Sequence, residues 1–310
     1  MGGFPWIPFL ITVGLILTAM TAVVRAGSRT NFTISDWIDP LSYPVPPFPP
    51  TDDLQRIPVA VNEDRRPVTL PLLGNHLLIA GVTGSGKGSV IWSLVAGIQP
   101  ARREGLVEIH ATDPKGGMEL LPGFELFDDV VDNPDQGVQL LEWAVDEMNA
   151  RARRLADVNI RKLLPGDPEQ EEVLGVREPL IVVLIDELAD LLDSPDRELR
   201  KRCHQALQAL LRKGRAVGFC VIGATQDARV EVIGMRALFR QRIALRTADA
   251  NQADMILGMG AREAGAETHR IPRAHPGIGY LMTEGGLPRR VRFSYFSDQD
   301  IQRLCEEAAA

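Results

Sequence analysis

The sequence predicts an α/β domain built on a mostly parallel sheet with helices on both faces. From about residue 57, short apolar runs alternate with amphipathic helical segments, which is the pattern of such sheets. The chain has 310 residues, 45% hydrophobic and 24% charged, so one large domain can bury a sizeable core. Ligands of this fold bind outside the carboxyl ends of the strands, where we expect the functional residues.

Each predicted element follows from its pattern. Apolar runs of four to eight residues are typical of buried strands, and longer stretches with one apolar face are typical of helices. The expected strands are residues 76–81, 106–115, the apolar start of 179–192, 219–226, 241–247 and 277–283. The expected helices are residues 88–98, 135–164 and 198–218.

Residues 1–27 are predicted to be a single transmembrane anchor. Residues 2–24 carry no charge, and ten of the 18 residues 7–24 are Ile, Leu, Val or Phe. A helix of that length spans about 27 Å, close to the hydrocarbon core of a bilayer. A cleaved signal peptide or a buried core helix is the alternative, but the segment lacks a positive n-region and a polar face. Arg25 and Arg29 follow it, which predicts that the rest of the chain lies in the cytoplasm, held at the cell membrane through residues 4–24.

A proline-rich linker is expected between the anchor and the main domain. The stretch "DPLSYPVPPFPP" has six prolines in twelve residues and predicts a semi-rigid spacer, with a partner-binding role as the alternative. The expected domains are therefore 1–27, the linker 28–56, and a domain at 57–310. The three cysteines are far apart and are interpreted as reduced and structural.

The stretch "LLIAGVTGSGKGSV" resembles a phosphate-binding loop between a strand and a helix. Gly81, Gly86 and Lys87 match the pattern, but Gly88 stands where Ser or Thr is usual and Ser89 follows one residue late. In a working loop, backbone N–H groups hold phosphates and Lys87 contacts the β- and γ-phosphates. A glycine turn needed only for packing is the alternative.

Two adjacent carboxylates follow the most apolar strand. "LIVVLIDELADLL" runs into Asp186 and Glu187, and buried carboxylates are costly without a cation or a catalytic task. In phosphate-loop ATPases the first holds Mg²⁺ and the second polarises the attacking water. Acidic capping of an ordinary helix is the alternative.

Further polar residues lie at or near strand ends. Thr225 and Gln226 end the run "VIGATQ", where a side chain can sense a γ-phosphate beside the carboxylates, although a structural turn is the alternative. Asp113 in "ATDPK" and Arg215 in "RKGRAVG" are weaker candidates.

Five ordered segments together resemble the motor domain of the FtsK/SpoIIIE family of DNA translocases. They are "GVTGSGKGSV", "DPKGGMEL", "IVVLIDELADLL", "KGRAVGFCVIGATQ" and "ILGMG", and the resemblance covers roughly residues 66–305. It implies a RecA-like P-loop ATPase that uses ATP and Mg²⁺. It also implies a ring of identical subunits, usually a hexamer, that moves double-stranded DNA.

The resemblance also implies roles for individual residues. Lys87 grips ATP, Asp186 serves Mg²⁺, Glu187 activates water, and Gln226 senses the γ-phosphate. Arg215 falls where the family has an arginine finger that acts on the neighbouring subunit. The nucleotide-binding residues implied are Gly81, Val82, Thr83, Gly84, Ser85, Gly86, Lys87, Gly88 and Ser89.

Gly88 removes one Mg²⁺ ligand from the usual set. A Gly-Lys-Gly-Ser version also occurs among actinobacterial relatives of the family. Ser89 cannot simply replace the hydroxyl, because one helical step turns a side chain by about 100°. A water, or a shifted helix start that brings Ser89 round, is expected to complete the metal site.

The charge distribution bears on a nucleic-acid partner. The net charge is −7, yet residues 197–246 hold twelve Lys and Arg against three Asp and Glu. Such a region suits a pore that follows the phosphate backbone without reading bases. The alternative is that these cations are the solvated face of an amphipathic helix.

Three functions remain open from the sequence. A membrane-anchored DNA translocase for conjugative transfer or segregation is preferred, because one membrane segment and a short C-terminal end fit a compact single-motor transfer protein. A ring ATPase that drives protein secretion and a catalytically silent nucleotide-binding scaffold are the alternatives.

Overall fold

The structure is a computed structural model that describes residues 39–226 and 234–309. Its residues from Pro40 onward form one compact unit, separate from residues 1–39. Within the described ranges, no helix has the length and apolar character needed to cross a membrane. The predicted anchor, residues 1–27, lies outside the described residues.

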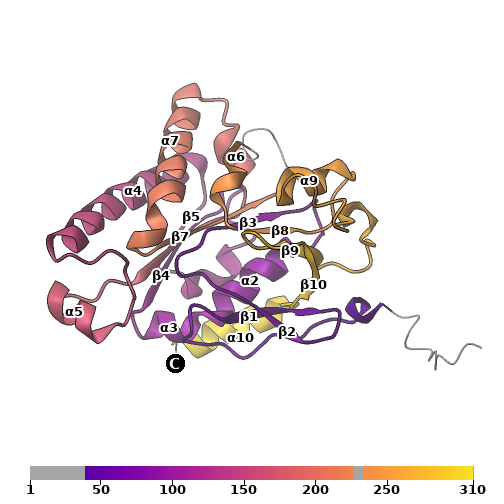
Figure 1. Cartoon of the computed structure of the whole chain (residues 1–310), viewed down its shortest axis with the longest axis horizontal. Coiled ribbons are helices and arrows are strands. Elements are labelled where there is room, and N and C mark those ends of the chain that lie inside the picture. Colours follow the sequence, from indigo (N-terminus) through magenta and orange to yellow (C-terminus); the bar gives the residue numbers. More distant parts are fainter. Residues whose placement is uncertain (1–38, 227–233, 310) are drawn as a thin grey trace, which may run out of the picture. The chain divides into compact units, whose positions relative to one another are not determined.

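A ten-stranded mixed sheet is the frame of this unit (Figure 1). The order is β2-β1-β10-β9-β8-β3-β7-β6-β4-β5. The strands are β1 (Ile57–Asn62), β2 (Pro67–Leu70), β3 (Leu77–Ala80), β4 (Val107–Thr112), β5 (Asp129–Val131), β6 (Leu180–Ile185), β7 (Phe219–Thr225), β8 (Gln241–Ala244), β9 (Ile278–Met282) and β10 (Arg289–Phe293). Strands β8, β3, β7, β6, β4 and β5 pair in parallel, which confirms the predicted parallel core.

Helices cover both faces of the sheet, as the sequence predicts (Figure 1). They are α2 (Lys87–Gly97), α3 (Gln99–Arg103), α4 (Pro134–Asp157), α5 (Pro168–Leu174), α6 (Leu188–Leu192), α7 (Arg197–Lys213), α9 (Asn251–Leu257) and α10 (Asp298–Ala309). Short 3₁₀ turns are η2 (Pro40–Ser42), η3 (Leu121–Leu126), η4 (Gly214–Val217), η5 (Arg236–Leu238) and η6 (Thr268–Arg270).

Strand β6 shows how the sequence builds the two cores. All six of its residues are buried, and they alternate between the faces because strand side chains have a period of two. Leu180, Val182 and Leu184 join the cluster that includes α2, whereas Ile181 and Val183 join the cluster beneath α4 and α7. A strand buried on both faces is apolar throughout, which is why it is so clear in the sequence.

Two helix boundaries differ from the sequence prediction for local reasons. Helix α4 ends at Asp157, where residues up to 164 were expected, because Asn159 adopts a left-handed conformation with φ of 61°. Helix α7 begins where the side chain of Asp196 accepts hydrogen bonds from the N–H groups of Glu198 and Leu199. It ends at Lys213 and is followed by η4 and Gly218.

The proline-rich stretch is packed on the domain from Pro40 onward. Leu41 and Val45 are buried, and the backbone N–H of Tyr295 donates to the carbonyl of Val45 at 2.9 Å. Arg292 donates to the carbonyls of Leu41 and Ser42. This part of the expected spacer therefore belongs to the surface of the compact unit.

Candidate nucleotide-binding site

The loop between β3 and α2 has a backbone that glycine makes possible. Gly84 and Gly86 have φ of 68° and 101°, which disfavour any other residue. A Cβ at Gly86 would lie 2.3 Å from the backbone N of Gly277. That N–H donates to the carbonyl of Ser85 at 2.8 Å, so the residue just before β9 packs against the loop and bonds to it.

Backbone hydrogen bonds fix the loop to the neighbouring strands. The N–H of Gly81 donates to the carbonyl of Thr225 at 3.1 Å, and the N–H of Val82 donates to the carbonyl of Arg246 at 3.0 Å. The Oγ of Ser85 is buried and has no hydrogen-bond partner within the described part of the chain. The loop backbone is therefore held in place, while the Ser85 hydroxyl has no partner among the described residues.

Lys87 begins α2 and points towards the end of β6. Its Nζ lies 3.9 Å from Oε2 of Glu187, and both side chains are largely buried. Burial lowers the pKa of Lys87, against the opposing attraction of Glu187 and Asp186. An amine in such a position is well placed to contact phosphates that enter the loop.

Asp186 lies at the carboxyl end of β6 among other carboxylates. Its pKa is raised to about 7, chiefly by burial and next by the neighbouring charge of Asp113, whereas Lys87 acts in the opposite direction. Within the described ranges, no three His, Cys, Asp or Glu side chains are arranged to hold a metal by themselves. This donor set fits Mg²⁺, which usually combines one or two carboxylates with water and phosphate oxygens.

Glu187 has two partners besides Lys87. Its carboxylate accepts the backbone N–H of Gln226 at 3.1 and 3.2 Å, and it pairs with Nζ of Lys115 at 3.1 Å. Burial lowers the pKa of Lys115, but the hydrogen bond to Glu187 and the nearby carboxylates outweigh it, so the net shift is upward. The carboxylate is thus fixed at the edge of the site.

Gln226 connects the end of β7 to the loop. The Oγ of Thr83 donates to Oε1 of Gln226 at 2.7 Å. Residues on the loops that follow β3, β6 and β7 therefore meet at one edge of the sheet, where the sequence predicts them.

Arg215 does not join this group. It is half-buried in η4, which precedes β7, whereas Gln226 follows the same strand. The seven residues of β7 separate the two, which at about 3.3 Å per residue is roughly 23 Å. Arg215 therefore lies at the opposite edge of the sheet from its own subunit's site.

The segment after β4 contributes residues to which the sequence analysis gave no role. Asp113 is buried, and its carboxylate accepts backbone N–H groups of Lys115, Glu119 and Leu120 at 3.3, 2.9 and 3.3 Å. It organises a turn that carries Lys115 and Glu119 to the site. The available signal was their place just after a strand that ends at the same sheet edge.

The residue at which α2 begins determines where the Ser89 side chain lies relative to the hydroxyl that Gly88 lacks. The helix begins at Lys87, so Gly88 and Ser89 both lie within its first turn. Ser89 is thus rotated by about 100° from the usual hydroxyl position. A Cβ at Gly88 would lie 3.4 Å from Oε2 of Glu119.

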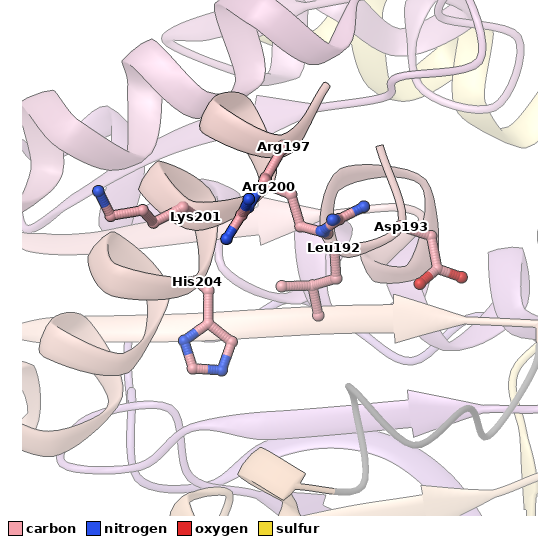
Figure 2. Close-up of a pocket in the computed structure, with 6 residues that line it drawn as sticks. All are labelled: Leu192, Asp193, Arg197, Arg200, Lys201 and His204. Carbon is pink, nitrogen blue, oxygen red and sulfur yellow. The ribbon is translucent and has the colours of Figure 1, made fainter. Parts of the chain in front are cut away.

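A hollow of about 540 Å³ lies between the end of α6 and the first turns of α7 (Figure 2). Its lining contains none of the predicted nucleotide-binding residues. Arg197, Arg200, Lys201 and His204 of α7 line it together with Leu192 and Asp193. The four α7 side chains are exposed, so this hollow presents positive charge to solvent.

A sequence model of the FtsK/SpoIIIE family matches residues 47–265. The chain belongs to the FtsK/SpoIIIE family. The DNA translocase FtsK of Streptococcus agalactiae is 31% identical over 267 residues, which cover 82% of this chain and 31% of that protein. The FtsK of Corynebacterium efficiens is 29% identical over 253 residues, covering 75% and 25%. The chain thus spans a third or less of the length of these curated relatives.

Solved structures share the fold. The pCW3 conjugation coupling protein TcpA, in its monomer form with ATPγS, has a TM-score of 0.67 at 23% identity, covering 86% of this chain and 75% of that one. The cytoplasmic domain of the type VII secretion ATPase EccC from Thermomonospora curvata has a TM-score of 0.68 at 23% identity, covering 91% and 34%. Family membership confirms the sequence prediction of a P-loop ATPase.

Proposed function

We propose that this FtsK/SpoIIIE-family chain couples ATP hydrolysis to the movement of double-stranded DNA. The observation that carries the proposal is the meeting of Lys87, Glu187 and Gln226 at one sheet edge, with Lys87 Nζ 3.9 Å from Glu187 Oε2. A catalytically silent scaffold has no need to hold a buried glutamate between a lysine and a backbone N–H group.

Each residue of the proposed ATPase centre has a task that its position supports. The loop from Gly81 to Ser89 and the Lys87 amine bind the phosphates, while Glu187 orients and deprotonates the attacking water. Gln226, bonded to Thr83 of the loop, reports the presence of a γ-phosphate to β7. Asp186 holds Mg²⁺, which neutralises phosphate charge when it is bound.

Positive charge near α7 supports a DNA partner. The hollow lined by Arg197, Arg200 and Lys201 is open, and cations of this kind bind phosphates without reading sequence (Figure 2). Arg202 is different, because it forms a two-point ion pair with Glu142 at 2.6 and 2.8 Å. Within the hollow, Arg200 donates to the carbonyl of Ser194 at 2.9 Å and Lys201 lies 3.8 Å from Glu198, yet both side chains remain exposed to a polyanion.

Assembly and location complete the proposal. We infer a ring of identical subunits, in which Arg215 of one subunit reaches the ATP site of the next, because it lies at the edge remote from its own. We also infer that residues 4–24 anchor the chain in the cell membrane with the motor in the cytoplasm. Their uncharged run and the arginines that follow it support that inference.

The test is hydrolysis of ATP by the purified chain with and without double-stranded DNA. We expect hydrolysis that DNA stimulates and that Lys87→Ala abolishes. Hydrolysis without any response to DNA would favour a secretion ATPase, whose fold EccC shares. No hydrolysis at all, with ATP still bound, would favour the silent scaffold.

For the cellular role we propose transfer of double-stranded DNA between cells. The conjugation coupling protein TcpA, which has the same fold, supports this proposal. The frequency of DNA transfer from a donor strain that carries Glu187→Gln in place of the normal chain tests this role. An unchanged frequency would leave segregation as the better account.

A further inference from the structure

The proposed Mg²⁺ site lacks one ligand at Gly88. In the usual loop the residue after the lysine supplies a hydroxyl to the metal. Here that residue has no side chain, and α2 already includes it, so Ser89 faces a different direction. Another group must take the place of the hydroxyl if the metal is to be held as firmly.

Glu119 occupies the neighbourhood of the missing side chain. A Cβ added to Gly88 would lie in van der Waals contact with its Oε2, at 3.4 Å, so a carboxylate oxygen lies beside the position that a serine or threonine side chain would occupy. Glu119 comes from the turn after β4, far from Gly88 in sequence. The absence of a side chain at Gly88 therefore leaves room beside the Glu119 carboxylate.

The backbone beneath Glu119 is fixed. Its N–H donates to Oδ2 of Asp113 at 2.9 Å, and the next N–H, of Leu120, reaches the same oxygen at 3.3 Å. Asp113 and Leu120 are both fully buried. The carboxylate thus extends from an anchored turn, as a metal ligand requires.

Its charge acts on the site and has no ion-pair partner there. Oε2 of Glu119, 3.4 Å from a Cβ added to Gly88, lies beside the first turn of α2, which begins with the phosphate-binding Lys87. Among residues 39–226 and 234–309, no cation forms an ion pair with it. Its side chain is exposed, so a hydrated cation can reach it.

We propose that Glu119 supplies the carboxylate, directly or through one water, that replaces the loop hydroxyl on the Mg²⁺ bound with ATP. This inference rests on the proposed nucleotide-binding function. Replacing a neutral hydroxyl by a carboxylate has a measurable consequence. Without a divalent cation, Glu119 repels the triphosphate, and with the cation it helps to bind it, so nucleotide affinity depends unusually strongly on Mg²⁺.

The experiment measures this dependence directly by calorimetric binding of ATPγS to the full-length chain in detergent. Each protein is titrated once in EDTA and once in excess MgCl₂. The quantity compared is the ratio of the dissociation constant in EDTA to the dissociation constant in MgCl₂. We expect Glu119→Gln to reduce the ratio about tenfold, the scale of losing a metal-supporting group. Part of that change is tighter binding in EDTA, because one negative charge is gone. The matched control Glu125→Gln, from the same segment, should keep the wild-type ratio, and Ser89→Ala is measured beside it as the test of the alternative ligand.

A compensating variant separates a metal role from a structural one. Gly88→Ser restores the usual hydroxyl, so Gly88→Ser with Glu119→Gln should recover the wild-type affinity in MgCl₂ while keeping the EDTA affinity of Glu119→Gln, and the ratio should rise part of the way back. Binding of Mn²⁺ to the nucleotide complex, followed by electron paramagnetic resonance, should show the same loss and recovery. Thermal unfolding of each variant checks that the fold is retained.

Two results would overturn the inference alone. One is a wild-type ratio in Glu119→Gln, and the other is a ratio lost in Ser89→Ala, which would make Ser89 the ligand. A wild-type chain that binds no nucleotide in either buffer would overturn the proposed function together with the inference.

Discussion

Nζ of Lys115 lies 3.1 Å from Oε2 of Glu187, closer than Nζ of Lys87 at 3.9 Å. The glutamate proposed to activate water is therefore held from the side of β4 as well as by the backbone N–H of Gln226. Lys115 also approaches Asp190 at 3.7 Å, which fixes its own position. It is well placed to set the direction of the Glu187 carboxylate.

Lys115→Met should lower the rate of ATP hydrolysis roughly tenfold, because small misplacements of a reacting group are costly. The dissociation constant of ATP should change little, since Lys115 is proposed to act only through Glu187. Lys115→Arg keeps a cation at the site and should recover most of the rate. Steady-state kinetics with a separate binding measurement distinguishes this role, and equal losses in rate and affinity would contradict it.

Glu187→Gln should bind ATP normally and turn over at least about a hundredfold more slowly, the scale of losing a general base. The amide oxygen can still accept the N–H of Gln226, so the local structure should persist. Lys87→Ala should instead weaken ATP binding itself. If both variants lose binding to the same degree, the division of roles between loop and glutamate is wrong.

The parallel core and its site were predictable because their signals are local. Strand β6 is a continuous apolar run, and each motif of the site follows its strand directly, so parallel pairing brings the motifs to one edge. The edge strands were harder to predict from the sequence. Strand β1 contains Pro58, and β10 has three arginines among five residues, so neither is a continuous apolar run of the kind that marks β6.

Contacts between distant segments were also not predictable. Lys115 and Glu119 reach the site because Asp113 collects three backbone N–H groups around its carboxylate, and a residue pattern does not show such a turn. The opposite placement of Arg215 and Gln226, by contrast, follows from the strand that separates them in sequence.

Deleting residues 1–27 should give a protein that remains in the soluble fraction after lysis and still binds ATP. Every predicted nucleotide-binding residue lies beyond Pro40, within the compact unit of residues 40–310. Fractionation and ATP titration of the fragment 28–310 provide the measurement. A fragment that stays with the membranes, or that is folded but no longer binds ATP, would contradict the proposed two-part organisation.

Asp186 predicts how the stability of this fragment depends on pH. Its pKa is raised to about 7, first by burial and then by Asp113, whereas an unfolded aspartate titrates near 4. Between these values the folded state holds a proton that the unfolded state has lost, so stability falls as pH rises from about 4 to about 7. Asp186→Asn removes this pH-dependent contribution to the stability. Without nucleotide or metal, it should match the wild type near pH 4 and exceed it by on the order of 2–4 kcal/mol at pH 8, measured by urea unfolding.

Arg215 offers the sharpest choice between a catalytic and a structural role. It sits in η4, at the opposite end of β7 from Gln226, so any part it plays in hydrolysis must be at another subunit's site. An arginine at the γ-phosphate supplies about 10³–10⁵ in rate in related chemistry. A cation that merely ends a helix contributes roughly 0.3–1 kcal/mol to stability and nothing to catalysis.

Arg215→Ala should therefore lower DNA-stimulated hydrolysis by about a thousandfold or more while leaving ATP binding intact. Subunits with Arg215→Ala keep their own Lys87, and subunits with Lys87→Ala keep their Arg215, so mixing the two restores some interfaces with an intact loop and an intact arginine. We expect mixed rings to regain part of the activity that neither variant has alone. Mixed rings that form and stay inactive would contradict action between subunits. Near-normal hydrolysis by Arg215→Ala alone would leave the residue only a structural role at the end of α7.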